Sequence, residues 1–193
     1  GGKPADRCKS DDLFLTEKAS SSAISISFPV LRPRPGRSSR QNNHIRTLWH
    51  PDMDKITKRL SELRNRLARA ARRAGRPTPV LLAVSKMRSS DEIRTMHEAG
   101  QIAFGENYVQ EAMAKQEELS GLGIEWHLIG HLKSNKAREA ATRFDWVQSI
   151  DRVKRVDALA DARPAGMAPL NVLVQVNIDD EAGKHGCHPD DAA

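Results

Sequence analysis

From Pro77 onward the sequence alternates between short apolar runs and amphipathic stretches, and this alternation constrains the fold more than any other feature. The run VLLAV at 80–84 is apolar at every position, which is typical of a strand buried on both faces of a parallel sheet. Ser89 and Ser90 can cap a helix that ends at Gly100. The predicted strands are 80–84, one beginning at 102–104, 124–129, 146–150 and 170–178, and the later predicted helices are 109–119, 135–143 and 153–162.

Strand and helix together take about 20 to 25 residues in each unit, which predicts an α/β fold with a parallel sheet and right-handed crossovers. No Gly-x-Gly-x-x-Gly follows the first strand, so a dinucleotide-binding Rossmann domain is disfavoured. A TIM-type (β/α)8 barrel fits better, although it takes eight strands and about 250 residues. We therefore interpret residues 53–193 as the N-terminal part of such a barrel, incomplete here with about five of eight βα units.

Residues 1–52 have a different composition from the rest of the chain. No acidic residue occurs between Glu17 and Asp52, and serines, arginines and prolines dominate that stretch. Low hydrophobicity with many Pro and Ser residues predicts a disordered or non-native basic extension. An organellar leader has a similar composition, but acidic residues among the first 17 argue against it. We favour Met53 as the natural start.

A basic amphipathic helix is predicted directly after Met53. Apolar residues recur there at alternating steps of three and four up to Ala74, and the helix ends at Gly75. Its other faces are rich in Lys and Arg, which would also suit RNA or an anionic membrane. We expect instead that the apolar stripe packs on the domain that follows, because most such helices cover a core.

Charge and cysteine content exclude several classes of protein. Residues 1–76 hold 18 Lys and Arg against 7 Asp and Glu, a net charge of +11, whereas 77–193 carry −5. The overall charge of +6 is therefore weak evidence for a nucleic-acid partner, and we predict none. Two distant cysteines cannot form a disulfide framework, and no apolar run approaches the roughly 20 residues of a membrane span.

In parallel α/β barrels the functional groups lie on the loops after the strands. Lys86 is the most informative of these residues, because it directly follows an apolar strand. We expect its stem to be buried, which would lower the pKa of its amine and allow a Schiff base with an aldehyde. The alternative is a lysine that reaches solvent or pairs with a carboxylate such as Glu106. The other candidates are Ser85, Gly105, Asn107, His131, Lys133, Ser134, Asn135, Ser149, Asp151, Asn177, Asp179 and Asp180.

Three further residue patterns are weaker evidence for a functional site. His185, Cys187 and His188 are spaced too tightly for separated ligand pairs, so we predict no metal site and attribute them to a loose chain end. His127 lies within an apolar strand and is expected to be a satisfied core residue. A triad of Ser85, His131 and Asp151 lacks the Gly-x-Ser-x-Gly turn, and we predict no catalytic residues.

Four segments together resemble the YggS/PROSC family of pyridoxal 5′-phosphate (PLP) homeostasis proteins, which are related to the N-terminal barrel domain of alanine racemase. They are LLAVSK at 81–86, FGENYVQEA at 104–112, EWHLIGHLKSNK at 125–136 and PLNVLVQVNI at 169–178. The resemblance implies a barrel of the alanine racemase type. It also implies that PLP forms a Schiff base with Lys86, and that Asn107 lies near the cofactor.

Members of this family are regarded as non-enzymatic, which implies a protein that buffers or delivers PLP to PLP-dependent apo-enzymes without turnover. We expect a cytoplasmic monomer. The family's phosphate cradle and the arginine facing the pyridine nitrogen are not found in this sequence, and Met87 replaces a common threonine. A chain lacking that cradle should hold PLP weakly.

Two other functions stay open from the sequence. One is a PLP-dependent amino-acid racemase or decarboxylase of the same barrel type, which would need a second acid–base group on the opposite face of the cofactor. The other is a nucleic-acid-binding module formed by the basic residues 1–76, whose binding would depend steeply on salt.

Overall fold

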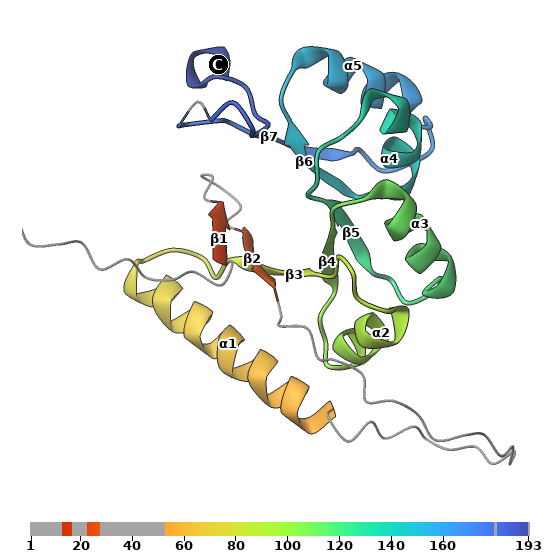
Figure 1. The fold of residues 1–193 in the computed structure, drawn as a ribbon. Coiled ribbons are helices and arrows are strands. Elements are labelled where there is room, and N and C mark those ends of the chain that lie inside the picture. Colours follow the sequence, from red (N-terminus) through yellow and green to blue (C-terminus); the bar gives the residue numbers. More distant parts are fainter. Residues whose placement is uncertain (1–12, 17–22, 28–52, 180, 193) are drawn as a thin grey trace, which may run out of the picture.

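The computed structural model describes residues 13–16, 23–27, 53–179 and 181–192, and within them seven strands form one sheet in the order β1 to β7 (Figure 1). β1 pairs antiparallel with β2, and every other neighbouring pair is parallel. The strands are β1 (Leu13–Thr16), β2 (Ala23–Ser27), β3 (Val80–Val84), β4 (Ala103–Glu106), β5 (Glu125–Leu128), β6 (Trp146–Ile150) and β7 (Asn171–Val174).

Among the helices of the described residues, α2 has a side-chain cap, whereas α3, α4 and α5 begin without one. Ser89 caps α2 through a capping box, in which its hydroxyl accepts from the Glu92 N–H and the Glu92 carboxylate accepts from the Ser89 N–H. The helices are α1 (Met53–Arg73), α2 (Ser90–Glu98), α3 (Val109–Glu118), α4 (Ala137–Arg143) and α5 (Val153–Ala162), with 3-10 turns η1 (Ser134–Lys136) and η2 (Pro189–Asp191).

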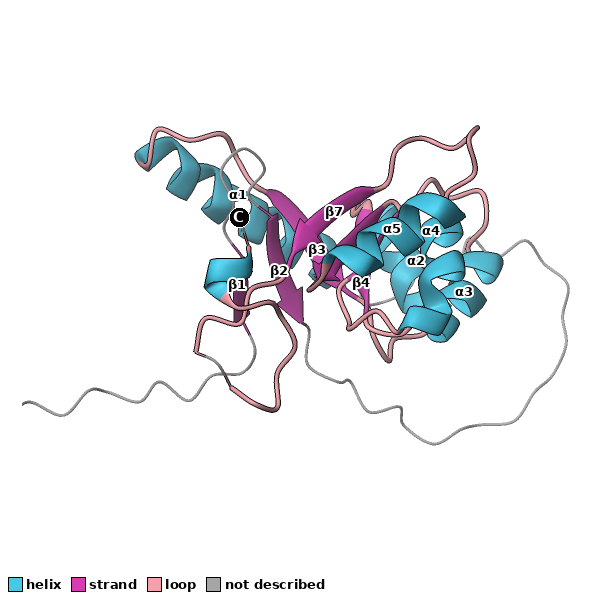
Figure 2. Cartoon of the chain, turned by 90° about the horizontal axis from the view of Figure 1, so that it is seen from above, coloured by secondary structure: helices cyan, strands magenta, loops and turns pink. Residues whose placement is uncertain are grey.

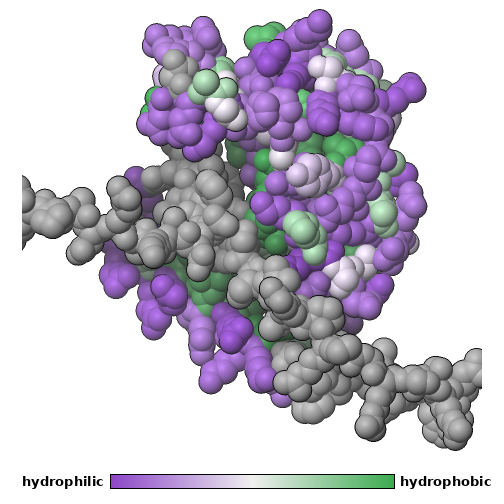
Figure 3. Space-filling view, in the orientation of Figure 1, coloured by the Kyte–Doolittle hydropathy of each residue, from purple (hydrophilic) through white to green (hydrophobic). Residues whose placement is uncertain are grey.

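Helices α2 to α5 gather on one side of the curved row of strands, and both ribbon views show this layer (Figures 1 and 2). The main core fills the space between this layer and β3 to β6, with Phe104, Leu128 and Phe144 among its fully buried side chains. The outward surface of the helical layer is mostly hydrophilic (Figure 3). The arrangement matches the N-terminal part of a barrel, with four consecutive βα units followed by the fifth parallel strand, β7, after which the described residues hold only the 3-10 turn η2.

The predicted strands and helices agree closely with the structure, except at the last strand. β3 and α5 have the predicted bounds, whereas β7 ends at Val174 instead of residue 178. Val172 and Val174 are 40% and 39% exposed, so the fifth predicted strand is not buried on both faces. The reason is that β7 lies at the edge of the sheet in the described residues, with a neighbour on one side only.

Helix α1 is separate from the helical layer and is linked to it by Arg64. The Arg64 guanidinium donates to the Gly100 carbonyl at 2.7 Å and to the Gln101 side-chain oxygen at 3.3 Å, beyond the end of α2. Leu60 is buried, which supports the predicted apolar stripe, although Ala71 rather than Ala70 is buried near the helix end. Among the described helices, none has the length and apolar composition needed to cross a membrane.

Two short strands lie within residues 1–52. β2 pairs in parallel with β3, with Ala23 opposite Val80 and Ser27 opposite Val84, and β1 pairs with the outer side of β2. These strands depart from the expected unstructured extension. The rest of residues 1–52 lies outside the described residues, so the predicted domain boundary stays a prediction.

Candidate functional site

The loops that follow β3 to β7 all lie at the carboxyl ends of the strands, on one side of the sheet, because the strands are parallel. These loops carry the candidate residues that the sequence singled out. Lys86 follows β3, Asn107 follows β4, His131 follows β5 and Asp151 follows β6. Parallel topology is therefore what brings together residues that lie far apart in the sequence.

Lys86 lies in a tight turn. The Arg88 N–H donates to the Ser85 carbonyl at 3.0 Å, and Met87 has a φ of 60°, a left-handed conformation that is uncommon for a residue with a side chain. Lys86 is exposed, so the expectation that its stem is buried is wrong. The turn directs the chain away from the core immediately after Ser85, which is 4% exposed. Within the described residues, the Lys86 amine makes no hydrogen bond or ion pair.

A buried ionic network lies beneath this turn. Glu106 at the end of β4 is fully buried and accepts from Ser85 Oγ at 2.6 Å and from Lys115 Nζ at 2.7 Å. Lys115 Nζ also donates to the Ser85 carbonyl at 2.8 Å and to Glu111 Oε1 at 2.7 Å, so each of its three protons has an acceptor. Glu111 Oε1 in turn accepts from the Met87 N–H at 2.6 Å. The network thus fixes the backbone on both sides of Lys86.

The two carboxyl groups of the network are shifted in opposite directions. Burial raises the pKa of Glu106, although hydrogen bonds from Lys115 and Ser85 oppose the change. Partial burial also favours a higher pKa for Glu111, but the hydrogen bonds from Lys115 and the Met87 N–H outweigh this effect. The pKa of Glu111 is therefore lowered. Within the described residues, Glu106 Oε2 is buried and has no hydrogen-bond partner.

Sequence reasoning missed Lys115 and considered a pair between Lys86 and Glu106 instead. In the structure Glu106 forms its ion pair with Lys115, whose side chain is only 8% exposed. A signal was present in the sequence, because Val109, Ala112 and Lys115 are spaced by three residues and form the buried face of α3. A lysine on the apolar face of a helix indicates a buried partner.

Asn107 lies in the loop directly after Glu106, and the loop after β5 presses against it. A Cβ atom on Gly130 would lie 2.0 Å from the Asn107 carbonyl oxygen, so only glycine allows this approach. The Gly130 carbonyl also accepts from Ser149 Oγ at 2.6 Å. Asn107 is half-buried, and its backbone position is set by contact with the neighbouring loop.

One of the weaker patterns resolves as expected. His127 is 3% exposed, contacts Glu125 and Gln148 through its two ring nitrogens at 2.7 and 2.9 Å, and stacks on Trp146, so it is a satisfied core residue. The Ser85 hydroxyl donates to Glu106, and the absence of a serine triad stays a prediction.

The segment that carries His185 and Cys187 is not a loose chain end, contrary to the sequence interpretation. The Cys187 N–H donates to the Gln175 carbonyl and the Asn177 N–H donates to the Cys187 carbonyl, both at 2.9 Å. A parallel bridge between Val176 and Cys187 therefore fixes this segment beside the end of β7. Its residues are mostly polar, so their composition alone gave no sign of this backbone pairing.

Comparison with known proteins agrees with this architecture. The family model described as alanine racemase, N-terminal domain, matches residues 59–193. The pyridoxal phosphate homeostasis protein of Pseudomonas aeruginosa is 48% identical over 141 residues, which is 72% of this chain and 61% of the relative. The protein of the same name from Escherichia coli K12 is 48% identical over 139 residues, covering 69% of this chain and 59% of the relative.

A solved structure extends the comparison to the fold. PipY of Synechococcus elongatus with PLP bound is 41% identical, has a TM-score of 0.58, and is matched over 70% of this chain and 59% of its own. This chain thus spans about three fifths of the length of these relatives.

Proposed function

Because the chain belongs to the alanine racemase N-terminal domain family, we propose that its barrel units bind PLP for storage or delivery, without catalytic turnover. Lys86 is the residue that attaches to the cofactor aldehyde, and Asn107 lies beside the cofactor. The names of the relatives and the PLP bound to PipY support this proposal.

The observation that carries the assignment is the turn at Lys86. A primary amine stands at the end of β3 without a partner among the described residues, while the backbone on either side is held by the buried Lys115 network. Such a strained turn persists only where its surroundings enforce it, and strain of this kind is common at ligand sites. The network thus positions the lysine but leaves its amine available.

The residues present fit one end of the cofactor. PLP supplies, when bound, an aldehyde that a primary amine takes up reversibly. Lys86 supplies that amine, and the Gly130 contact sets where the Asn107 loop lies beside it. Glu106 and Lys115 lie below the turn and act on its position rather than on the cofactor.

The proposal also covers the location, the oligomeric state and the partners of the protein in the cell. We assign the protein to the cytoplasm as a monomer, with PLP-dependent apo-enzymes as recipients of the cofactor. Reversible attachment to an exposed amine suits this role, because a competing amine can displace Lys86 and carry PLP away.

Reductive trapping tests the attachment residue. The 193-residue protein is mixed with PLP, reduced with borohydride and mapped by mass spectrometry. We expect the modified peptide to contain Lys86 and the adduct to be lost in Lys86→Ala. Lys133→Ala is the matched control, because Lys133 is an exposed lysine on the loop after β5, which also lies at the carboxyl ends of the strands. An adduct retained in Lys86→Ala would refute the assignment.

A turnover assay tests the absence of catalysis. D- and L-amino acids are incubated with the PLP-loaded protein, and racemisation and decarboxylation are followed by chiral chromatography. We expect no more conversion than free PLP gives. Conversion that requires Lys86 would replace the carrier function with an enzymatic one.

A further inference from the structure

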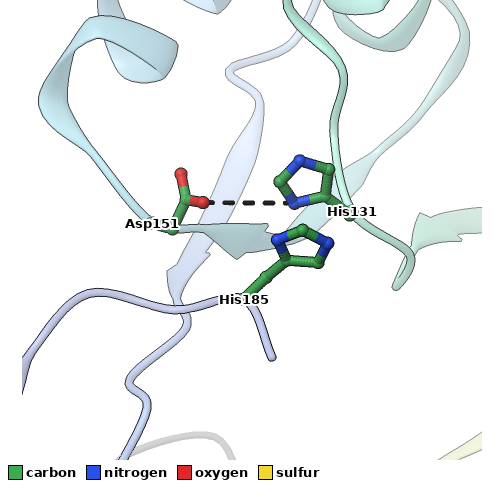
Figure 4. Close-up of side chains that lie close together, drawn as sticks. All are labelled: His131, Asp151 and His185. Atoms are coloured by element: carbon green, nitrogen blue, oxygen red, sulfur yellow. Dashed lines mark ion pairs between the residues drawn. The ribbon is translucent and has the colours of Figure 1, made fainter. Parts of the chain in front are cut away.

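Three side chains with metal-binding atoms meet at the strand ends. His131 follows β5, Asp151 follows β6, and His185 comes from the segment folded back beside β7. One ligand atom from each lies within 4.8 Å of the other two, and the three side chains lie close together (Figure 4). None of them belongs to the Lys86 turn or its supporting network.

Each of the three is held in place by its surroundings. The Asp151 side chain is only 4% exposed, and its Oδ2 lies 4.0 Å from His131 Nδ1. The His185 ring stacks on the His131 ring with centroids 3.5 Å apart. The His185 carbonyl accepts from the Gln175 side chain at 2.8 Å, so its backbone is anchored to the end of β7. The backbone of His185 is thus anchored, and the side chains of His131 and Asp151 are both in contact with Arg155.

We propose that His131, Asp151 and His185 form a binding site for a divalent transition-metal ion of the zinc class. Two imidazole nitrogens and one carboxylate oxygen are a common three-ligand set for zinc, which leaves a fourth position for water. Imidazole favours zinc, copper and nickel over magnesium and calcium, which take oxygen ligands. This proposal departs from the sequence-based prediction of no metal site, which rested on the spacing of His185, Cys187 and His188.

The separations suit such an ion. Bonds of about 2.0 to 2.2 Å to the metal allow two ligand atoms to lie at most about 4.4 Å apart. The 4.0 Å between His131 Nδ1 and Asp151 Oδ2 already falls within this limit. The remaining pairs lie within 4.8 Å. Because an imidazole nitrogen binds a metal in the plane of its ring, the stacked His131 and His185 rings must turn out of their parallel arrangement for both to bind one ion.

Arg155 is the competing cation. Its guanidinium lies 2.9 Å from Asp151 Oδ1, and 3.0 and 3.4 Å from the two ring nitrogens of His131. An entering metal ion uses Asp151 Oδ2 and displaces the guanidinium from one ring nitrogen, while the contact to Oδ1 can remain. The ion therefore binds against nearby positive charge, which lowers its affinity.

Metal titration tests the site, and it is run without PLP. The 193-residue protein is titrated with ZnCl2 by calorimetry and with CoCl2 by visible absorption, which reports the ligand geometry around cobalt. We expect one ion per chain, and a loss of affinity of about tenfold or more in His131→Ala and in His185→Ala. His188→Ala is the control, because His188 belongs to the same segment but lies outside the cluster.

Two outcomes would overturn the proposal. One is the absence of saturable one-to-one binding in the wild-type protein. The other is binding that survives His131→Ala but is lost in His188→Ala or Cys187→Ser, since the ligands would then be the His-Gly-Cys-His run. Circular dichroism of each variant distinguishes the loss of a metal ligand from the loss of the fold. Asp151→Asn, which keeps the shape of the side chain, removes the carboxylate ligand in a further variant.

Discussion

The close approach of the loops after β4 and β5 makes Gly130→Ala the sharpest test of how Asn107 is positioned. The new Cβ would lie 2.0 Å from the Asn107 carbonyl oxygen and 2.7 Å from its carbonyl carbon and Cα. Ordinary van der Waals contact begins near 3.4 Å, so the two loops must separate by 3.4 − 2.0 = 1.4 Å. The obstacle is backbone, which cannot rotate away as a side chain would.

The cost of this separation can be worked out from the contacts it strains. Overpacking a well-packed site costs about 1 to 3 kcal/mol. The Gly130 carbonyl accepts from Ser149 Oγ, and weakening that hydrogen bond adds about 0.5 to 1.5 kcal/mol. We therefore expect Gly130→Ala to lower the free energy of unfolding by about 1.5 to 4.5 kcal/mol. Because a binding residue must keep its place to within about 0.5 Å, we also expect weaker PLP binding.

Urea unfolding followed by circular dichroism measures the first effect, and PLP titration measures the second. Gly166→Ala is the matched control, because a Cβ there meets nothing within 4 Å and the backbone has no positive φ. A loss below about 0.5 kcal/mol in Gly130→Ala, within the range of ordinary surface substitutions, would refute the argument.

Two further predictions concern the buried network. Lys115→Met leaves Glu106 buried without its cation, so we expect a loss of about 3 to 5 kcal/mol in urea unfolding at neutral pH, and a loss near zero would show that the pair does not stabilise the fold. The pH dependence of Glu106 follows from its raised pKa: the folded state binds the proton more tightly than the unfolded chain, whose pKa is near 4.5. The contribution of Glu106 to stability is thus fully present below pH 4.5 and is lost as pH rises through the folded pKa. The unfolding free energy of wild type relative to Glu106→Gln should fall over that window in a series of urea titrations, and a rise would contradict the assignment.

The alternation of apolar runs and helices was sufficient to predict the βα units. The run at 80–84 and the helix at 153–162 are continuous patterns of local sequence, and both have the predicted bounds. The last strand was predicted too long because its extent depends on what packs beside it. Val172 has an apolar side chain, yet it is 40% exposed in an edge strand.

The candidate site was predicted less completely than the fold. The parallel direction of the predicted strands placed Lys86, Asn107 and Asp151 together, because the carboxyl ends of parallel strands lie on the same side of the sheet. The burial of Lys115 and the proximity of His185 to His131 arise from tertiary contacts, which local patterns do not encode. Lys86 is exposed in a turn whose next residue, Met87, has a left-handed conformation and donates its N–H to Glu111 of α3, and local patterns did not indicate this contact either.

The left-handed conformation of Met87 has a consequence for attempts to stabilise this protein. A residue held in a sparsely populated backbone region costs about 1 to 3 kcal/mol, and glycine at that position would avoid the steric part of this cost. The same replacement would let the chain around Lys86 sample many more conformations, so the amine would spend less time in one orientation. Thermostability and ligand retention therefore oppose each other at residue 87, and selection for heat resistance alone would favour variants that hold their ligand less well.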